Sequence, residues 1–193
     1  MGGRNLPLTI VVLFEGDLGR RLARWRRSYD PLGADRIPPH LTLVSPFLAQ
    51  PPLLPLERRL WAVCHSLPPV SLELGDVARD GGLLYVDVVS GGPELARLRD
   101  ALCAGPLAGY AEAADPPAGR AGTFQSRVVL AEPATGSELA AASKQLVGLQ
   151  VRSSHEVKAL HLMAAHADGS WYVRDFFNLD GAYSARSAAA RAG

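Results

Sequence analysis

The sequence predicts an α+β fold with mixed or antiparallel strands, rather than a doubly wound parallel sheet. Two observations indicate this class. A strand–helix–strand pattern over residues 8–45 recurs over residues 83–131. Alternating runs at 70–77 and 83–89, the second of which opens the second repeat, flank Arg79-Asp80-Gly81-Gly82, a sequence typical of a β-hairpin turn. Hairpins placed among helices are a feature of α+β proteins.

The first repeat contains the clearest elements. Residues 8–14 form a short, β-branched and continuously apolar run, as in a buried strand. A helix is expected over 17–29, because apolar residues recur there at intervals of four, three and four: Leu18, Leu22, Trp25 and Tyr29. Pro31 and Gly33 are expected to end this helix, and a second strand is expected over 40–45.

The remaining apolar patterns predict helices over 56–67, 94–104 and 137–149 and strands over 127–131, 157–165 and 171–179. The proline-rich stretch 46–55 and the Ala/Gly/Pro-rich stretch 105–122 are expected to be loops. We expect one domain over 1–183, followed by a small, polar, frayed tail over 184–193.

Composition narrows the class of protein. The 193 residues include 48% hydrophobic and 20% charged side chains, which excludes wholesale disorder. The 20 basic and 19 acidic residues leave a formal charge of +1, which argues against binding long nucleic acid by neutralising phosphates. A small charged ligand in a focused cleft is compatible with this charge. The basic residues are 18 Arg and 2 Lys, an excess that a genome-wide compositional bias explains. The arginine cluster within 20–27 is expected to be a solvated helix face rather than an RNA-binding surface.

The two cysteines and the lengths of the apolar runs indicate the cellular compartment of the protein. Cys64 and Cys103 lie on apolar stripes of expected helices and are predicted to be buried thiols of a reducing compartment. The N-terminal residues lack the pattern of a secretory signal, and the apolar run at 10–14 is too short to span a bilayer. We therefore expect a cytoplasmic protein that does not contact membranes.

The sharpest local feature is Pro38-Pro39-His40-Leu41-Thr42-Leu43-Val44-Ser45-Pro46-Phe47. On a strand, His40 and Thr42 point to one face, and the leucines between and after them point to the other. An imidazole can transfer protons near neutral pH, and a hydroxyl can donate a hydrogen bond to a phosphoryl oxygen. Taken alone, the pair also fits two polar residues on a wet sheet face.

With its surroundings, from Arg27-Ser28-Tyr29-Asp30-Pro31 to Phe47, the motif resembles the 2′-5′ RNA ligase-like family, also called the two-histidine phosphoesterase superfamily. The resemblance covers most of the chain. It implies a bilobal fold in which two pseudo-symmetric lobes face a central cleft, with helices outside. It also implies one His-x-Thr/Ser motif per lobe. The two histidines then act as general base and general acid on a 2′,3′-cyclic phosphate or a 2′-5′ linkage, without a metal.

The second motif departs from the family pattern. It is expected within Phe124-Gln125-Ser126-Arg127-Val128-Val129-Leu130-Ala131. Arg127 stands where the second histidine is expected, and Val129 where the second Thr or Ser is expected. Arginine stays protonated, so Arg127 can bind a phosphate but cannot serve as a general base or an efficient acid. Loss of one acid–base partner typically costs about 10²–10⁴ in rate, so full two-histidine catalysis is not expected.

Three other residues are candidates for the cleft. His161, in Ala159-Leu160-His161-Leu162-Met163, could face the cleft and replace the missing histidine, although a structural histidine is the simpler interpretation. Tyr85 could stack on a base or be an ordinary sheet aromatic, and Phe47 carries the same ambiguity. The sequence has no glycine-rich phosphate loop, no Cys/His metal-ligand spacing and no nucleophile-elbow motif.

The first hypothesis is a divergent member of this family that binds a phosphorylated nucleotide or RNA end. His40 and Thr42 are its catalytic-type residues, and Arg127 and Thr42 would bind the phosphate. One alternative is an active metal-independent 2′,3′-cyclic phosphodiesterase that uses His40 with a relocated partner. Another is a non-catalytic protein-interaction scaffold. No cofactor and no metal are expected, and the protein is expected to be a monomer.

Overall fold

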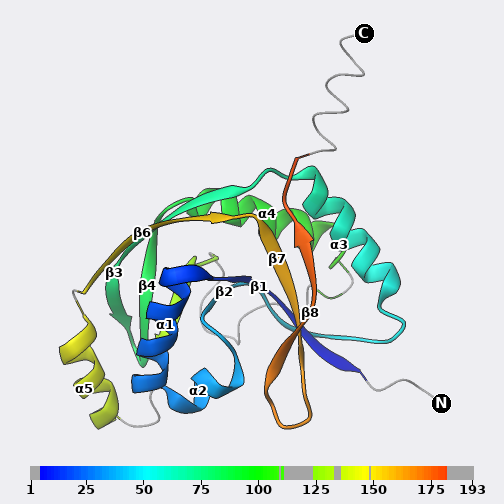
Figure 1. Ribbon diagram of the computed structural model, residues 1–193. Helices are drawn as coiled ribbons and strands as arrows, with labels where there is room; N and C mark the ends of the chain where they lie inside the picture. The colour runs from blue at the N-terminus through cyan, green and yellow to red at the C-terminus, as the bar shows by residue number, and fades with distance from the viewer. Residues whose placement is uncertain (1–4, 109, 111–123, 133–135, 148, 182–193) are drawn as a thin grey trace.

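The computed structural model describes residues 5–108, 110, 124–132, 136–147 and 149–181. Its helices are α1 (Gly16–Tyr29), α2 (Pro31–Arg36), α3 (Leu54–Ser66), α4 (Gly92–Ala104) and α5 (Gly136–Leu146). Its strands are β1 (Leu6–Leu13), β2 (His40–Ala49), β3 (Val70–Asp80), β4 (Leu83–Ser90), β5 (Arg127–Ala131), β6 (Gln150–Val157), β7 (Ala159–Ala165) and β8 (Trp171–Asn178). They form one eight-stranded antiparallel sheet in the order β6-β3-β4-β5-β2-β1-β7-β8 (Figure 1). The α+β class predicted from the sequence is therefore confirmed.

The sheet consists of two four-stranded halves that meet where β5 pairs with β2. Each half contains the same unit, a strand followed by a helix and then by the neighbouring antiparallel strand. The unit is β1–α1–β2 in one half and β4–α4–β5 in the other. Both helices reach across the boundary between the halves, because α1 contacts β5 and α4 contacts β2 as well as β3 of its own half. The recurrence in the sequence is thus a pseudo-twofold arrangement about the β2–β5 pair.

The sheet is strongly curled. Its edge strand β6 and the strand β7, which lies next to the opposite edge, are separated in the chain by a single residue, Lys158. Figure 1 shows β6 running along the top of the molecule and β7 turning down from its end. The rings of Phe14, which follows β1, and His155, on β6, lie 4.9 Å apart between centroids. The curl therefore brings the two halves of the sheet together at β6 and β7.

Most of the hydrophobic core lies on one face of the central strands, although β1 is buried on both of its faces. Alternate residues of the central strands point to this core, and Leu41, Val86 and Val128 among them are fully buried. Helices α1, α3, α4 and α5 add their own apolar side chains to the same cluster, for example Leu22 of α1 and Leu98 of α4. A fully buried Leu or Val side chain contributes about 1.5–3 kcal/mol by leaving water. This burial fixes which side chains of the sheet lie on the opposite face.

The segment after α1 differs from the sequence prediction. Residues 31–36 form the short helix α2 instead of a turn. The Asp30 carboxylate accepts a hydrogen bond from the Gly33 backbone N–H at 2.9 Å, and Pro31 occupies the first helical position. The residues that were expected to stop one helix therefore start another.

Two strands also differ. β2 continues through Pro46 to Ala49, beside a bulge in its pairing with β1, where a strand tolerates proline. The expected helix over 137–149 ends at Leu146, and residues 150–157 form β6, which was not predicted. The β3–β4 hairpin is confirmed, and Gly81 supplies the left-handed backbone of its turn, with φ of 57°.

Two of the predicted segments extend into residues that the structure does not describe. Residues 111–122 of the expected loop and the expected tail 184–193 lie outside the described residues. Cys64 is buried as predicted, Cys103 is half-buried, and no disulfide joins them. Across the described ranges, no helix is long and apolar enough to cross a membrane.

Candidate functional site

The start of β2 presents the predicted histidine and threonine on the sheet face opposite the core. His40 and Thr42 are half-buried, whereas Leu41 and Leu43, which alternate with them, are 0% and 2% exposed. The strand alternation expected from the sequence therefore holds over these residues. We call the side of the sheet that carries His40 and Thr42 the His40 face.

The register of the two central strands sets the neighbours of this pair. Leu41 on β2 lies opposite Val128 on β5 in an antiparallel ladder. One residue to either side, this register puts His40 opposite Val129 and Thr42 opposite Arg127. Residues directly opposite each other in a sheet share a face, so all four side chains lie on the His40 face. The pseudo-twofold arrangement therefore places the two positions of the second motif, Arg127 and Val129, beside Thr42 and His40 on the same face.

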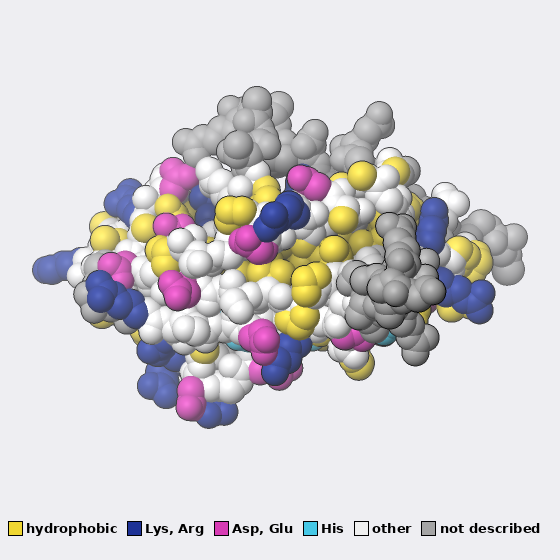
Figure 2. Space-filling model, turned by 90° about the horizontal axis from the view of Figure 1, so that it is seen from above, with side chains coloured by type: hydrophobic (Ala, Val, Ile, Leu, Met, Phe, Trp, Pro, Cys, Tyr) yellow, Lys and Arg dark blue, Asp and Glu magenta, His cyan; other side chains and the backbone are white. Residues whose placement is uncertain are grey.

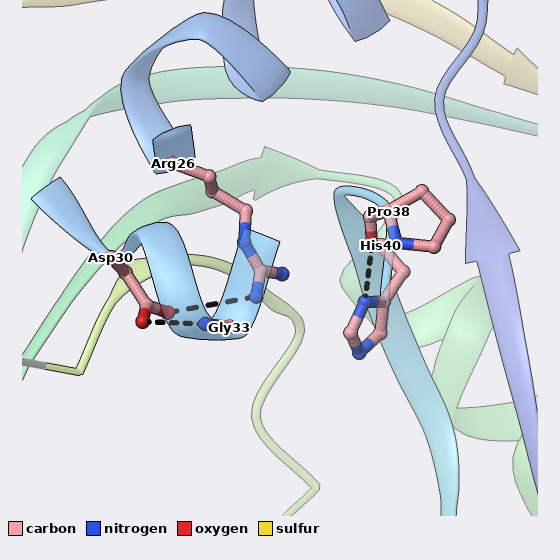
Figure 3. A network of polar contacts seen from close by, with 5 residues as sticks. All are labelled: Arg26, Asp30, Gly33, Pro38 and His40. Atoms are coloured by element: carbon pink, nitrogen blue, oxygen red, sulfur yellow. Dashed lines mark hydrogen bonds and ion pairs between the residues drawn. The ribbon is translucent and has the colours of Figure 1, made fainter. Parts of the chain in front are cut away.

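His40 is held in one tautomer. Its Nδ1 lies 2.8 Å from the Pro38 carbonyl oxygen, and because a carbonyl only accepts, Nδ1 carries the proton and donates it (Figure 3). Nε2 is then left as an acceptor. Burial lowers the pKa of His40 from 6.5 to about 4; the positive charge of Arg26 also lowers this pKa, and the hydrogen bond to Pro38 opposes the shift. His40 is therefore a neutral imidazole at physiological pH, able to accept a proton but a weak base.

Arg127 is engaged by neighbouring side chains. Its Nη1 lies 3.3 Å from Asp80 Oδ2, at the end of β3, and its guanidinium lies over the ring of Tyr85, 5.2 Å from the centroid. Tyr85 is opposite Val129 in the ladder between β4 and β5, so it also lies on the His40 face. The side chain of Arg127 is 25% exposed. An incoming phosphate would therefore have to compete with Asp80 for this guanidinium.

His161 is on the same face but is not next to His40. Val11 on β1 lies opposite both Thr42 and His161, so one strand separates the two. Two strand spacings put the backbone of His161 about 10 Å from that of Thr42. The Nδ1 of His161 is buried without a hydrogen-bond partner among the described residues, and burial lowers the pKa of this imidazole. The structure thus places a second imidazole on the His40 face at a distance from the first.

Phe47 lies in the hydrophobic core and not in a cleft. It is 1% exposed, and its ring centroid is 5.3 Å from that of Tyr110. The ladder with β1 explains this, because Phe47 lies opposite Leu8, which is itself a buried core residue. A different phenylalanine is exposed on the His40 face, namely Phe176, which lies opposite His161 and is 57% exposed.

A cavity of about 500 Å³ opens beside His40, and we call it the His40 cavity. It is formed by the end of α1, by α2, and by the central strands where β2 starts and β5 ends. Its lining residues are Arg26, Tyr29, Asp30, Pro31, Leu32, Gly33, Arg36, His40, Val129, Glu132 and Glu138. Arg26 was expected on a solvated helix face, but it is buried. The spacing of the sequence indicates the buried position, because Arg26 follows Leu18 and Leu22 at helical intervals of four.

The donor set of this region does not suggest a metal site. In the part of the chain that the structure describes, no three His, Cys, Asp or Glu side chains gather closely enough to hold a metal ion. The chemistry available at the site comes from an imidazole, a hydroxyl, guanidinium groups and separate carboxylates.

Comparison with known proteins agrees with this geometry. The family model described as the 2′-5′ RNA ligase superfamily matches residues 14–169, which include both central strands. The chain belongs to the 2′-5′ RNA ligase superfamily. The resemblance seen in the sequence is thereby confirmed, and the curled antiparallel sheet with its two related halves is the fold of this superfamily.

Individual proteins resemble this chain in sequence or in fold. A protein of Geobacillus thermodenitrificans (strain NG80-2) named "Putative phosphoesterase" is 26% identical over 176 residues, which cover 89% of this chain and 95% of that protein. The crystal structure of TT0787 of Thermus thermophilus superposes with a TM-score of 0.64 at 18% identity, covering 90% of this chain and 97% of that one. E. coli LigT complexed with NADP⁺ gives 0.61 at 16% identity, covering 91% and 99%.

Proposed function

We propose that this protein binds a phosphorylated nucleotide or an RNA end on the His40 face, and that its two-histidine catalysis is impaired or lost. The observation that carries the proposal is the asymmetry of the two central strands. His40 and Thr42 on β2 lie opposite Val129 and Arg127 on β5. One half of the molecule has an imidazole and a hydroxyl, and the other half has a permanent cation and an apolar side chain at the related positions.

The chemistry of phosphodiester cleavage explains why this asymmetry matters. One group must take a proton from the attacking water, and another must give a proton to the departing alkoxide. The Nε2 of His40 can take the first proton. Arg127 can stabilise charge on a phosphoryl oxygen, but it holds its protons too tightly to donate one efficiently. Without a second imidazole, ligand binding is retained better than turnover.

The distribution of charge favours a small ligand over a long polyanion. Figure 2 shows Lys and Arg side chains interspersed with Asp and Glu side chains over the visible surface, without a continuous basic stripe. This agrees with a formal charge of only +1 and with a ligand that carries one or a few phosphates. E. coli LigT, which shares the fold, has been crystallised with ATP, NADP⁺ and 3′-AMP.

A second candidate function is an active 2′,3′-cyclic phosphodiesterase in which His161 replaces the missing histidine. The presence of His161 on the His40 face favours it. The separation of about 10 Å between the His161 and Thr42 backbones counts against direct action of both groups on one phosphorus atom. The open His40 cavity, in turn, counts against a scaffold whose binding site has closed.

Titration with 3′-AMP and 2′,3′-cyclic AMP, followed by calorimetry, tests the proposal. We expect wild-type protein to bind both, and His40→Ala to bind them about tenfold or more weakly, because a hydrogen-bonding group at the phosphate is lost. His166→Ala serves as the control, because His166 lies in the β7–β8 turn against Tyr172. Equal affinities for wild type and His40→Ala would contradict the proposal. Fast turnover that requires both His40 and His161 would establish the second candidate instead.

A further inference from the structure

Arg26 is buried in a way that its described partners do not explain. It is 4% exposed and lies on the same stripe of α1 as the core residues Leu18 and Leu22. Withdrawing a guanidinium from water is costly unless its charge and its N–H groups are matched. Arginine remains protonated even where burial lowers its pKa, as it does here. A buried cation of this kind calls for a negatively charged partner.

Asp30 meets this requirement only in part. The closest approach is 3.6 Å, from Arg26 Nη2 to Asp30 Oδ2, which is an ion pair but longer than a hydrogen bond. The other carboxylate oxygen of Asp30 is occupied by the N–H of Gly33. The Nε of Arg26 is buried with no hydrogen-bond partner among the described residues. The N–H groups of the Arg26 guanidinium, which can bind an anion through two parallel hydrogen bonds, are therefore only partly matched by protein acceptors.

Arg26 and His40 line the same cavity. Figure 3 shows the Arg26 guanidinium at the end of α1 on the side that faces His40, with α2 beside it. The charge of Arg26 acts on the His40 imidazole, as expected for groups that share a small volume. Arg127 is a less available cation, because Asp80 and Tyr85 hold it.

We propose that Arg26, rather than Arg127, is the phosphate-binding cation of this site, and that it holds the phosphoryl group of a nucleoside monophosphate in the His40 cavity. The inference rests on the proposed function and names the residue and ligand class that it requires. Asp30 and Glu132 line the same cavity, so a ligand with several phosphates would meet like charge there. Their carboxylates can instead accept hydrogen bonds from the hydroxyls of a ribose. A single phosphate with a sugar attached fits this mixture of charges.

Calorimetric titration of 3′-AMP and adenosine into single variants tests the role of Arg26. We expect Arg26→Gln to weaken 3′-AMP binding about tenfold or more and to leave adenosine binding unchanged, because only the phosphate contact is lost. The matched control is Arg24→Gln, two residues away on the exposed side of α1. Arg127→Gln is expected to have a smaller effect than Arg26→Gln. Wild-type affinity in a folded Arg26→Gln protein, or a larger loss in Arg127→Gln, would overturn the inference while leaving the proposed function intact.

Two further measurements separate a binding role from a structural one. Asp30→Asn keeps the acceptor for Gly33 but removes the charge that competes for Arg26, so 3′-AMP affinity is expected to stay equal or rise. A loss of affinity in Asp30→Asn equal to that in Arg26→Gln would assign the pair a structural role and overturn the inference. In wild-type protein, the ¹⁵Nε resonance of Arg26 is expected to shift on addition of 3′-AMP, and an unmoved resonance at saturation would also overturn it. A wild-type protein that binds neither 3′-AMP nor 2′,3′-cyclic AMP overturns both proposals.

Discussion

His40 combines two properties that the sequence could not supply together. Its position on β2 follows from strand alternation, but its neutrality depends on burial beside α2 and on the nearby charge of Arg26. The backbone carbonyl of Pro38 fixes the proton on Nδ1. A neutral imidazole with a free Nε2 suits a ligand that brings a proton donor, such as water or a ribose hydroxyl.

The lowered pKa of His40 predicts a specific dependence of stability on pH. Because the folded protein holds this imidazole unprotonated down to about pH 4, the unfolded chain binds an extra proton below its own pKa of about 6.5. Stability is then unaffected at pH 7, falls as the pH drops from about 6.5 to about 4, and changes no further below that. We expect wild type to lose about 2 kcal/mol more than His40→Asn between pH 7 and pH 4, allowing for partial solvent screening. Urea denaturation of both proteins at several pH values measures this difference, and parallel curves would refute it.

Two phenylalanines provide a matched test of which face of the sheet is packed. Phe47 is 1% exposed and Phe176 is 57% exposed. Phe47→Ala is expected to cost about 3–5 kcal/mol, because it leaves a cavity in the core. Phe176→Ala is expected to change the free energy of unfolding by less than about 0.5 kcal/mol. Equilibrium urea denaturation of the two variants decides the matter, and similar losses would mean that Phe176 is covered in solution.

At the scale of elements, α2 is the part of the fold that shapes the His40 cavity. It exists because Asp30 caps it and Pro31 starts it, and the cap depends on a residue without a side chain. A Cβ on Gly33 would clash with Oδ2 of Asp30 and lie only 2.8 Å from its Oδ1. The Asp30 carboxylate would have to turn away from both Gly33 and Arg26. The helix, the cap and the ion pair are therefore linked through one backbone position.

Gly33→Ala is expected to cost about 1 kcal/mol through loss of the cap. It should also speed amide exchange at Ala34 and Ile37, whose N–H groups bond within α2 to the carbonyls of Asp30 and Gly33. Gly82→Ala is the control, since a Cβ there meets nothing within 4 Å. Hydrogen exchange followed by NMR or mass spectrometry measures the effect. Unchanged protection in α2 would show that Asp30 can move without cost.

Local sequence patterns predicted the helices and strands better than they predicted the contacts between them. The strands at 8–14 and 127–131 and the β3–β4 hairpin follow from apolar runs and turn residues, and the structure has them. β6 could not be recognised, because Gln150–Val157 is largely polar and becomes a strand by pairing with β3. The burial of Arg26 likewise depends on the sheet and on α2, although its helical spacing pointed inward. Residue identity indicated His40 and Arg127, whereas the place of Arg26 beside His40 required the tertiary fold.

At the scale of the whole molecule, the pseudo-twofold arrangement about β2 and β5 makes the difference between the His40/Thr42 pair and the Arg127/Val129 pair a local one. The core residues next to it, Val128 and Leu130, remain fully buried, and the register with β2 is preserved. The β4–α4–β5 unit has thus kept its packing while its two outward-facing positions carry Arg127 and Val129. Placing His and Thr at positions 127 and 129 therefore tests whether this scaffold supports catalysis.

The double variant Arg127→His/Val129→Thr rebuilds a His-x-Thr pair on β5 opposite the pair on β2. If the scaffold is otherwise competent, turnover of 2′,3′-cyclic AMP should rise by about 10²–10⁴ over wild type, the usual contribution of one acid–base group. Both substitutions lie on a half-buried face, so the fold should tolerate them. Arg127→Gln/Val129→Thr is the control, because it removes the same cation without adding an imidazole. Introducing His40→Ala into the rebuilt protein should abolish the gain, since proton uptake and proton delivery need both histidines. If the rebuilt protein binds 3′-AMP but turns over no faster than the control, the second half has lost more than its motif, and the relation between the halves is one of packing alone.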